Sequence, residues 1–290
     1  MKKRAFIYIV IAGILWGTSS IFVHFLAPFG FSSPQMTFVR GFVTTISLSI
    51  YILIKDKSLF KAKFKEFLLF ALGGLSFFST ATCYYASMQM TSVSTAVVLM
   101  YIAPVLVMIY SVALLGEKLT PLKSISVLIM LIGCVLVSGV IGGLKFDFWG
   151  IIIGIMSGIS YAAYNVITKY QMRNGSNPLT ATFYCFAVSA LVGVFVCDAF
   201  AMPKLIAQSS YLTIPLLLGL GICTCVLPYF LYTLSLKELP VGTVASLGII
   251  EPMSATVLSV LFLNEVLSFT SAIGIVLILG AVFMLSKSKE

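Results

Sequence analysis

Hydrophobic residues run along this chain in continuous stretches, and short polar segments separate one stretch from the next. A helix needs roughly 20 mainly apolar residues to cross the hydrocarbon core of a bilayer, so each stretch predicts one membrane-spanning helix. The stretches do not alternate apolar and polar residues, as transmembrane strands would. The pattern therefore predicts an all-α integral membrane protein with ten transmembrane helices, near residues 5–27, 34–54, 67–89, 93–115, 121–139, 148–168, 178–198, 212–235, 242–263 and 268–286.

Composition supports a membrane protein. Of the 290 residues, 60% are hydrophobic and 9% are charged, whereas about a quarter of the residues of a typical soluble protein are charged. The first stretch follows the basic head at 2–4, but it is longer than the apolar part of a signal peptide and no small-x-small cleavage site follows, so we interpret it as the first span. The six cysteines fall inside or at the ends of predicted spans and indicate neither disulfides nor a metal site, and no cofactor is expected.

The net charge of +9 is divided unevenly between the two sides of the predicted membrane. With the N-terminus inside, the outer loops hold only Lys145 and Lys204. The positive-inside rule then predicts cytoplasmic termini in a multi-pass protein of the plasma (inner) membrane, and it explains the basic balance without a nucleic-acid partner. The basic residues expected on the inner side are Lys2, Lys3, Arg4, Lys55, Lys57, Lys61, Lys63, Lys65, Lys118, Lys123, Lys169, Arg173, Lys237, Lys287 and Lys289.

The second half of the sequence repeats the first. A shift of 148 positions aligns Tyr84 with Tyr232, Ser87 with Ser235, Val93 with Val241, Thr95 with Thr243, Pro104 with Pro252, Ser111 with Ser259, Glu117 with Glu265 and Leu119 with Leu267. Each copy holds five predicted helices, and because five is an odd number the second copy enters the membrane from the opposite side. Inverted repeats of this kind are typical of secondary transporters. We therefore expect a first repeat over residues 1–139, an outer linker over 140–147 and a second, inverted repeat over 148–290.

These features resemble a known family. The ten spans, the five-helix inverted repeat, the "P…GE" ending of the fourth span and the "EP…NE" ending of the ninth are similar to those of the drug/metabolite transporter superfamily, specifically its EamA-type carriers. Arg40, in "FVRGF", matches an arginine that this family often has in the second span. The resemblance covers essentially the whole chain. It implies a transporter but not a substrate, because relatives carry amino acids, sugars, nucleotides, quaternary amines and drugs.

Pro104 and Pro252 lie inside the fourth and ninth predicted spans at matching depths. A proline in a helix interior removes one backbone hydrogen bond and crowds the carbonyl four residues earlier, so both helices are expected to kink. Gly248, four residues before Pro252, eases that crowding. Paired kinks widen the space between two repeats, where carriers of this design bind substrate. Inherited packing kinks without a mechanistic role are the alternative.

Two charged residues are expected deep in the membrane. A carboxylate in hydrocarbon is costly unless it faces water, finds a partner or takes up a proton. Glu251 is therefore a candidate proton carrier, a candidate counter-charge for a substrate ammonium, or a structural partner of a neighbouring hydroxyl or of Arg40. Arg40, about two turns inside the outer end of its span, is a candidate for binding a carboxylate or phosphate, or an architectural partner.

Polar and aromatic residues complete the candidate site for substrate binding or coupling. The first and sixth spans carry matching stripes, Gly13, Gly17, Ser20 and His24 in one and Gly154, Gly158, Tyr161 and Asn165 in the other. The glycines predict close helix packing, whereas His24 could titrate near neutral pH or serve as an interface residue. An aromatic lining that stacks on rings or faces a cation is predicted from Trp16, Tyr84, Tyr101, Tyr161 and Tyr232. Glu117 and Glu265 are expected to organise turns at helix exits, with gating as the alternative.

The sequence as a whole favours a secondary active transporter of small organic metabolites that works by alternating access. Amino acids or their derivatives are the leading substrate class, the resemblance favours export, and transport is proton-linked if Glu251 titrates. An organic-cation or drug transporter is the alternative. A membrane-embedded enzyme is disfavoured because the chain has no P-loop, no paired histidine and acid motif and no G-x-S-x-G, and a scaffold would not need Glu251 and Arg40. The expected partners are a small-molecule substrate, the lipid bilayer and protons, with the oligomeric state open.

Overall fold

The computed structural model describes residues 2–91, 93–116, 119–138, 147–263 and 266–287. The regular structure in these ranges is helical throughout and they contain no β-strand, which confirms the all-α expectation for this part of the chain. Several residues named above lie outside the described ranges, namely Glu117, Lys118, Lys145, Glu265 and Lys289, together with nearly all of the expected linker at 140–147.

The helices follow the predicted spans, but several spans contain more than one helix. The first half of the chain forms α1 (Lys2–Gly17), α2 (Ser19–Leu26), the 3-10 turn η1 (Ala27–Phe29), α3 (Ser33–Lys55), the 3-10 turn η2 (Lys57–Phe60), α4 (Phe64–Met90), α5 (Val93–Met100), α6 (Ala103–Leu115) and α7 (Pro121–Val137). The second half forms α8 (Phe148–Arg173), α9 (Pro178–Val196), the 3-10 turn η3 (Ala199–Ala201), α10 (Met202–Ala207), α11 (Ser210–Gly221), the π-helical turn η4 (Ile222–Val226), α12 (Leu227–Glu238), α13 (Val241–Leu247), α14 (Ile250–Phe262) and α15 (Phe269–Ser286).

Nine helical segments of the described chain are long and apolar enough to cross a membrane. They correspond to nine of the ten expected spans. The tenth, expected near 121–139, forms α7, an apolar helix of 17 residues that ends at Val137, just before a part of the chain that is not described. It packs along α15, which does reach spanning length. The difference from the expectation is therefore the shortness of one helix.

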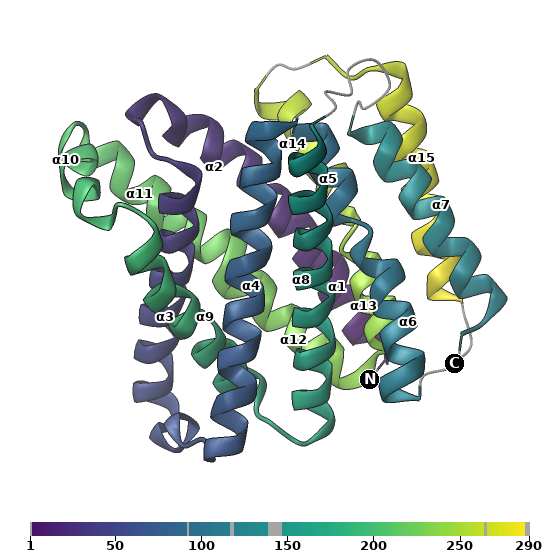
Figure 1. The fold of residues 1–290 in the computed structure, drawn as a ribbon, viewed down its shortest axis with the longest axis horizontal. Coiled ribbons are helices and arrows are strands. Elements are labelled where there is room, and N and C mark those ends of the chain that lie inside the picture. Colours follow the sequence, from purple (N-terminus) through teal and green to yellow (C-terminus); the bar gives the residue numbers. More distant parts are fainter. Residues whose placement is uncertain (1, 92, 117–118, 139–146, 264–265, 288–290) are drawn as a thin grey trace.

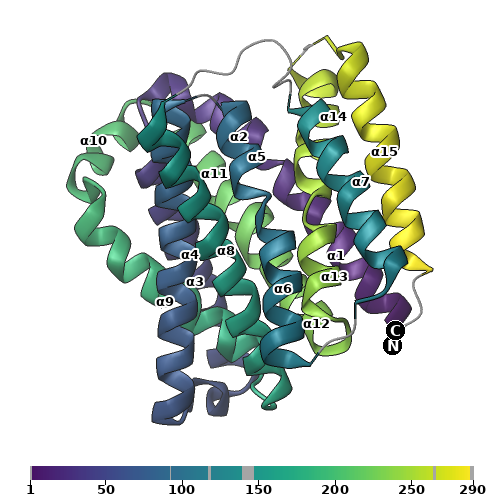
Figure 2. The same cartoon turned by 45° about the vertical axis from the view of Figure 1, so that its right-hand side comes forward.

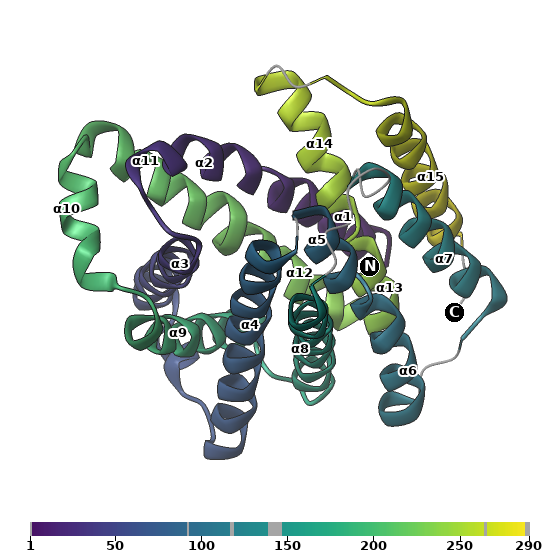
Figure 3. The ribbon, with the colours of Figure 1, turned by 45° about the horizontal axis from the view of Figure 1, so that its top comes forward.

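The helices form a bundle with a central group and two flanks. Figure 3 shows α1, α8 and α12 in the middle, α7, α14 and α15 on one side, and α3, α9 and α11 on the other. α7 and α15 lie side by side at one edge in both Figure 1 and Figure 2. α1 packs against α12 in the central group and against α14 on one flank, and α4 packs against α8 in the central group and against α9 on the other flank. Helices from the two halves of the sequence therefore alternate around the middle of the bundle.

Local capping groups set where the long spans begin. Ser32 forms a reciprocal capping box with Gln35 at the start of α3: the Ser32 N–H donates to Gln35 Oε1 at 2.9 Å, and the Gln35 N–H donates to Ser32 Oγ at 3.4 Å. At the start of α8, Asp147 Oδ1 accepts the N–H of Gly150 at 2.7 Å. These caps satisfy backbone donors that the first turn leaves free. They fix the register of α3 and α8, which carry Arg40 and Asn165.

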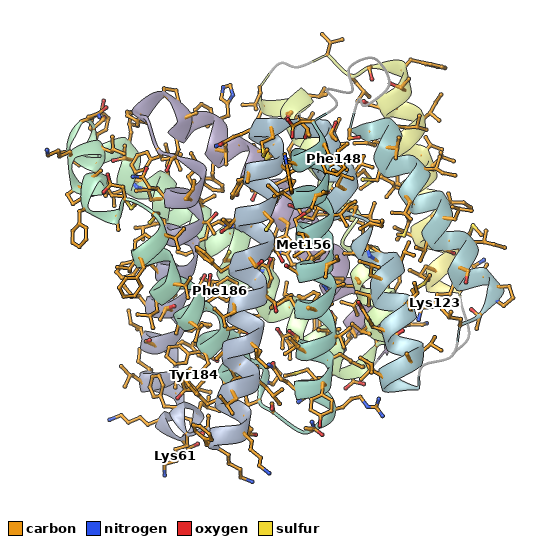
Figure 4. All side chains as sticks on the ribbon, viewed as in Figure 1. Lys61, Lys123, Phe148, Met156, Tyr184 and Phe186 are labelled. Atoms are coloured by element: carbon orange, nitrogen blue, oxygen red, sulfur yellow. The ribbon has the colours of Figure 1, made fainter. Side chains whose placement is uncertain are left out.

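Lys61 and Lys123 lie toward one end of the bundle. α1 begins and α15 ends toward this end, which we call the terminal end (Figure 1). Figure 4 shows Lys61 and Lys123 in the same lower part of the view and Phe148 toward the opposite, distal end. Near Lys61, the Ser58 N–H and hydroxyl donate to the exposed carboxylate of Asp56 at 2.9 and 2.8 Å. These hydrogen bonds hold the pKa of the Asp56 carboxyl below its usual value.

Candidate functional site between two broken helices

Two spans are broken near their middle, and the two breaks lie against each other. The fourth span divides into α5 and α6 around Tyr101, and the ninth divides into α13 and α14 around Gly248. The first turn of the next helix follows each break and contains Pro104 in α6 and Pro252 in α14. Where kinks were expected, the chain therefore forms separate helices that begin one or two residues before the prolines, so that each proline lies in a first turn, where it is tolerated.

Proline explains why a carbonyl is free at the second break. Pro252 has no N–H, so the Gly248 carbonyl, four residues earlier, lacks its usual helical donor. The Glu251 N–H donates to this oxygen at 2.9 Å, and the hydroxyl of Tyr101 lies 3.2 Å from it. A side chain from the first break therefore supplies a donor to the second.

The same hydroxyl reaches the intramembrane carboxylate. Tyr101 Oη lies 3.0 Å from Glu251 Oε2 and donates to it. Tyr101 is 2% exposed, whereas Glu251 is only half-buried. Of the two structural partners expected for Glu251, a hydroxyl or Arg40, the hydroxyl makes the hydrogen bond. A carboxylate that is partly exposed and bonded on one oxygen keeps acceptor capacity for another group.

Glu251 has polar neighbours from three further helices. It interacts electrostatically with Tyr84 of α4, Cys134 of α7 and Tyr161 of α8. Tyr161 comes close because position 248 has no side chain, since a Cβ on Gly248 would lie 3.2 Å from the Tyr161 hydroxyl oxygen. The break thus places one carboxylate among tyrosines from both halves of the sequence.

Arg40 projects from α3 and is held by the eighth span. Between α11 and α12 that span widens into the π-helical turn η4. Arg40 Nε donates to Cys225 Sγ at 3.2 Å, and Arg40 Nη2 donates to the carbonyl oxygen of Thr224 at 3.4 Å. A π-turn displaces the regular backbone bonding of a helix and is frequent at functional sites. Arg40 itself is half-buried.

The two intramembrane charges stand apart. Across the described ranges no carboxylate oxygen lies within 4.0 Å of the Arg40 guanidinium, so Arg40 and Glu251 do not form an ion pair. They interact electrostatically over a longer distance, and both interact with Tyr229 of α12. Tyr229 therefore lies close to both charges.

An aromatic and amide cluster lies next to Tyr229. The Trp16 ring centroid is 5.1 Å from that of Tyr229 and 5.7 Å from that of Tyr232. The Tyr232 hydroxyl donates to Asn165 Oδ1 at 2.6 Å, and Asn165 Nδ2 donates to the Tyr161 carbonyl at 2.6 Å. Trp16 is 3% exposed, and its Nε1 has no hydrogen-bond partner in the described part of the chain. Four predicted site residues are thus in one contiguous group.

Several residues of the site were not singled out by the sequence. Phe77 and Phe186 pack against Tyr229 with centroids 5.3 and 4.9 Å away, and Tyr164 stacks on Tyr232 at 6.0 Å. Figure 4 labels Phe186 at mid-height in the bundle. Tyr229 precedes Tyr232 by three positions, a helical spacing that puts both on one face and could have revealed it. Cys225 and the Thr224 carbonyl carried no comparable signal.

The remaining predicted residues lie farther out. His24 is exposed on α2, where its ring packs edge-on against Phe25 at 5.4 Å, and it does not contact the group around Glu251. Tyr84 is half-buried, with its ring 5.4 Å from that of Tyr85. The structure therefore brings Tyr84 near the carboxylate but leaves His24 at the surface.

The glycine stripes pack against the broken helices. Gly17 of α1 touches α14, where a Cβ on it would lie 2.6 Å from Ser254 Cβ. Gly158 of α8 touches the first break, where a Cβ would lie 2.9 Å from the Leu99 carbonyl oxygen and 3.2 Å from that of Met100. The Met100 carbonyl is the one that Pro104 leaves without a helical donor. In each case the opening helix of one half approaches the broken helix of the other half.

The terminal end of the bundle is closed by cations of α8. The buried Lys169 donates through Nζ to the Leu236 and Leu239 carbonyls at 2.8 and 2.6 Å, and Arg173 Nη1 donates to the Leu115 carbonyl at 2.6 Å. The neighbouring helix α13 is also covered, since every one of its residues is buried. Farther toward the distal end, each residue at 81–86 of α4 is partly exposed.

The geometry can now be compared with known proteins. A family model described as the EamA-like transporter family matches residues 3–139 and 148–287. The chain belongs to this family. The resemblance drawn from the sequence is thereby confirmed, and this EamA-like transporter is a multi-pass membrane protein whose family transports small molecules across the lipid bilayer.

Individual relatives agree with the family. The chain is 30% identical over 278 residues to an "uncharacterized transporter" of Archaeoglobus fulgidus, covering 95% of this chain and 94% of the relative. It is 26% identical over 299 residues to an "uncharacterized transporter" of Clostridium kluyveri, covering 99% and 95%. It is also 25% identical over 238 residues to the "uncharacterized inner membrane transporter YhbE" of Escherichia coli strain K12, covering 78% and 72%. These names are those of transporters, which argues against an enzyme.

A solved structure shares the fold of this EamA-like transporter. One crystal structure matches with a TM-score of 0.81 at 19% sequence identity and covers 98% of this chain and 96% of the other. Within the described residues, no group of three or more His, Cys, Asp or Glu side chains is arranged to hold a metal ion. The polar and aromatic groups that the site presents are Glu251, Arg40, tyrosine hydroxyls and aromatic rings.

Proposed function

We propose that this EamA-like transporter is a secondary active carrier that moves a small organic metabolite by alternating access. Amino acids or their derivatives are the leading substrate class, and export is the favoured direction by family habit. The carrier consists of two inverted five-helix repeats, residues 1–139 and 148–290, joined by an outer linker at 140–147, with α7 as the tenth span. Both termini lie in the cytoplasm, so the terminal end faces inward.

The hydrogen bond between the two breaks carries this proposal. Broken spans let a carrier bind polar substrate groups at mid-depth, because backbone and side-chain groups become available between the repeats. Here the Tyr101 hydroxyl of one break reaches the Gly248 carbonyl and the Glu251 carboxylate of the other. Substrate that binds Glu251 therefore acts on a contact between the two halves.

Unequal access from the two ends supports alternation. Lys169 and Arg173 tie α8 to the ends of α12 and α6 at the terminal end, whereas Glu251 and Arg40 remain half-buried. In this state an exporter releases its substrate to the distal side. Loading from the cytoplasmic side requires these bonds of α8 to open and the distal side to close.

Glu251 is proposed as the proton site, which makes transport proton-linked, with passive exchange as the rival mechanism. Glu251→Gln keeps the shape of the side chain and an acceptor for Tyr101 but cannot titrate. We expect flux into proteoliposomes by this variant to lose its dependence on pH. Glu238→Gln, at an exposed position at the end of α12, is the matched control and should behave as wild type. Glu251→Gln flux that keeps the wild-type pH profile contradicts the proton role.

A carrier of organic cations is the second candidate function. The observation that favours it is the half-buried Glu251 close to Tyr229, whose ring packs with Trp16 and Tyr232. Such rings attract cations through their faces, and the carboxylate supplies a counter-charge. Amino acids and simple amines both carry an ammonium group, so only direct comparison of the two classes separates the candidates.

The deciding experiment is a thermal-shift screen of the purified protein, followed by counterflow in proteoliposomes. Amino acids, amines, sugars and nucleotides are tested on wild type and on Glu251→Gln in parallel. A shift with amino acids that the variant loses, together with saturable counterflow, supports the proposal. A shift with amines alone favours the organic-cation carrier. Saturable transport of none of the four classes contradicts the carrier proposal.

A further inference from the structure

Arg40 has weaker hydrogen-bond partners than a guanidinium normally has inside a protein. A guanidinium carries five N–H donors and no acceptor, and it pairs best with a carboxylate at about 2.7–2.9 Å. In the described part of the chain, Arg40 donates to a thiol at 3.2 Å and to a carbonyl at 3.4 Å. Both acceptors are neutral and both distances are long, so an anion that reached Arg40 would make better bonds than either.

Arg40 is half-buried, so part of its side chain remains exposed, and its electrostatic neighbours Tyr85 and Tyr229 come from α4 and α12. Its two bonds lead to the π-helical turn η4 and not to a straight helix. A π-turn marks a place where a span departs from regular bonding, so Thr224 and Cys225 can change partners without breaking a regular helix.

We propose that Arg40 binds a carboxylate group of the transported molecule, and that this carboxylate replaces Cys225 and Thr224 as the partner of the guanidinium. The inference rests on the carrier function proposed above, because it supplies the anion-binding part of the same substrate site. Binding then frees α3 from the π-turn of the eighth span. The substrate thereby loosens a contact between the two halves of the chain.

The chemistry of the surroundings favours a carboxylate over a phosphate. Arg40 offers one positive charge, and Glu251 acts on it electrostatically from beyond ion-pair distance. The buried cation of α8, Lys169, is occupied by carbonyls at the terminal end. A monoanion adds one negative charge to the balanced pair of Arg40 and an ionised Glu251, whereas a phosphate dianion adds two, and the second charge is repelled by Glu251.

The fluorescence of Trp16 gives a direct reading of this site. The chain has two tryptophans. Trp149 is 64% exposed, so Trp149→Phe leaves Trp16, at 5.1 Å from Tyr229, as the single reporter. Acetate and benzoate are titrated against their neutral counterparts acetamide and benzamide at constant ionic strength, and methyl phosphate provides the phosphate comparison. We expect a saturable change in Trp16 emission with the carboxylates at concentrations at least tenfold lower than with the amides or methyl phosphate.

Substitutions distinguish carboxylate binding by Arg40 from a purely structural role of Arg40. In the Trp149→Phe background, Arg40→Gln should weaken carboxylate binding by about 10- to 100-fold, the range expected for hydrogen bonds to a charged group, and should remove the preference over amides. Arg40→Lys keeps the charge without the planar pair of donors and should lie between the two. Cys225→Ala removes an acceptor that the carboxylate must displace, so its carboxylate affinity should equal or exceed that of the parent.

The outcomes that overturn this inference differ from those that overturn the carrier proposal. Equal responses to carboxylates and amides in the parent, an unchanged preference in Arg40→Gln, or a loss in Cys225→Ala as large as in Arg40→Gln would show that Arg40 only supports the fold. Saturable transport can persist in each of these cases. Conversely, if the protein transports none of the tested compounds but binds carboxylates in a way that depends on Arg40, the carrier proposal is rejected and the carboxylate site at Arg40 is supported.

Discussion

Replacing Tyr101 by Phe tests the contact between the two broken helices. The substitution removes one hydroxyl and keeps the buried ring, which is 2% exposed. It deletes the bonds to Glu251 Oε2 at 3.0 Å and to the Gly248 carbonyl at 3.2 Å. The Gly248 carbonyl keeps the Glu251 N–H as a donor. The substitution therefore mainly affects the Glu251 carboxylate, which loses its hydrogen bond from Tyr101.

The expected magnitude follows from these partners. A hydrogen bond to a charged group contributes about 1.5–3 kcal/mol to stability and a neutral one about 0.5–1.5 kcal/mol. One hydroxyl proton serves both acceptors of Tyr101, so the two contributions do not add. We expect Tyr101→Phe to lower the free energy of unfolding by about 2 kcal/mol.

The assay is unfolding of the purified protein in mixed detergent, in a double-mutant cycle with Glu251→Ala. If the hydroxyl acts through Glu251, the two substitutions are not additive, and the coupling free energy is about 1–2 kcal/mol. Tyr84→Phe is the matched control, because the Tyr84 hydroxyl lies near Glu251 without a hydrogen bond in the described structure. It should change stability by less than about 0.5 kcal/mol. Additive effects of Tyr101→Phe and Glu251→Ala would refute the reasoning.

Two further substitutions test the helix contacts and the closed end. Gly17→Ala places a Cβ 2.6 Å from Ser254 Cβ, so it should cost about 1–3 kcal/mol in the same unfolding assay. Gly280→Ala meets no atom within 4 Å and should be neutral or stabilising by up to about 1 kcal/mol, and equal effects of the two would contradict the close approach. Lys169→Met removes the donor to two carbonyls at the end of α12. It should cost at least about 2 kcal/mol and speed amide hydrogen exchange at the end of α12, whereas unchanged exchange there would show that the bonds do not close this end.

The positions of the spans were predictable because the hydrocarbon core imposes a length on every helix that crosses it. The exception, α7, is apolar over 17 residues and ends at Val137. The breaks were predictable in place, because the missing N–H of Pro104 and of Pro252 is a local property. The hydrogen bond from the Tyr101 hydroxyl to the Gly248 carbonyl was not predictable. Tyr101 is distant in sequence, and only the packing of the two halves brings it close to Gly248.

The site was predictable where a residue violates the rules of its surroundings. Glu251 and Arg40 stand out because a charge inside a span is costly. The hydrogen-bond partners of Arg40 were not predicted, because a backbone carbonyl and a thiol in a π-turn leave no pattern in the sequence. His24 was selected for its chemistry and for its helical spacing from Gly13, Gly17 and Ser20, but its exposed position on α2 depends on how that helix packs.

The glycine contacts of α1 with α14 and of α8 with α5 bear on how fast the molecule can change state. Interlocked side chains must separate or change rotamer before two helices can slide past each other. At Gly17 and Gly158 one of the two helices contributes no side chain to the contact, so fewer interlocked side chains have to separate when these surfaces shift. In the alternating-access mechanism proposed above, we expect the activation barrier for opening to depend on a few polar bonds, those of Tyr101, Arg40 and Lys169. A substrate that competes for such bonds is then expected to change the turnover rate directly.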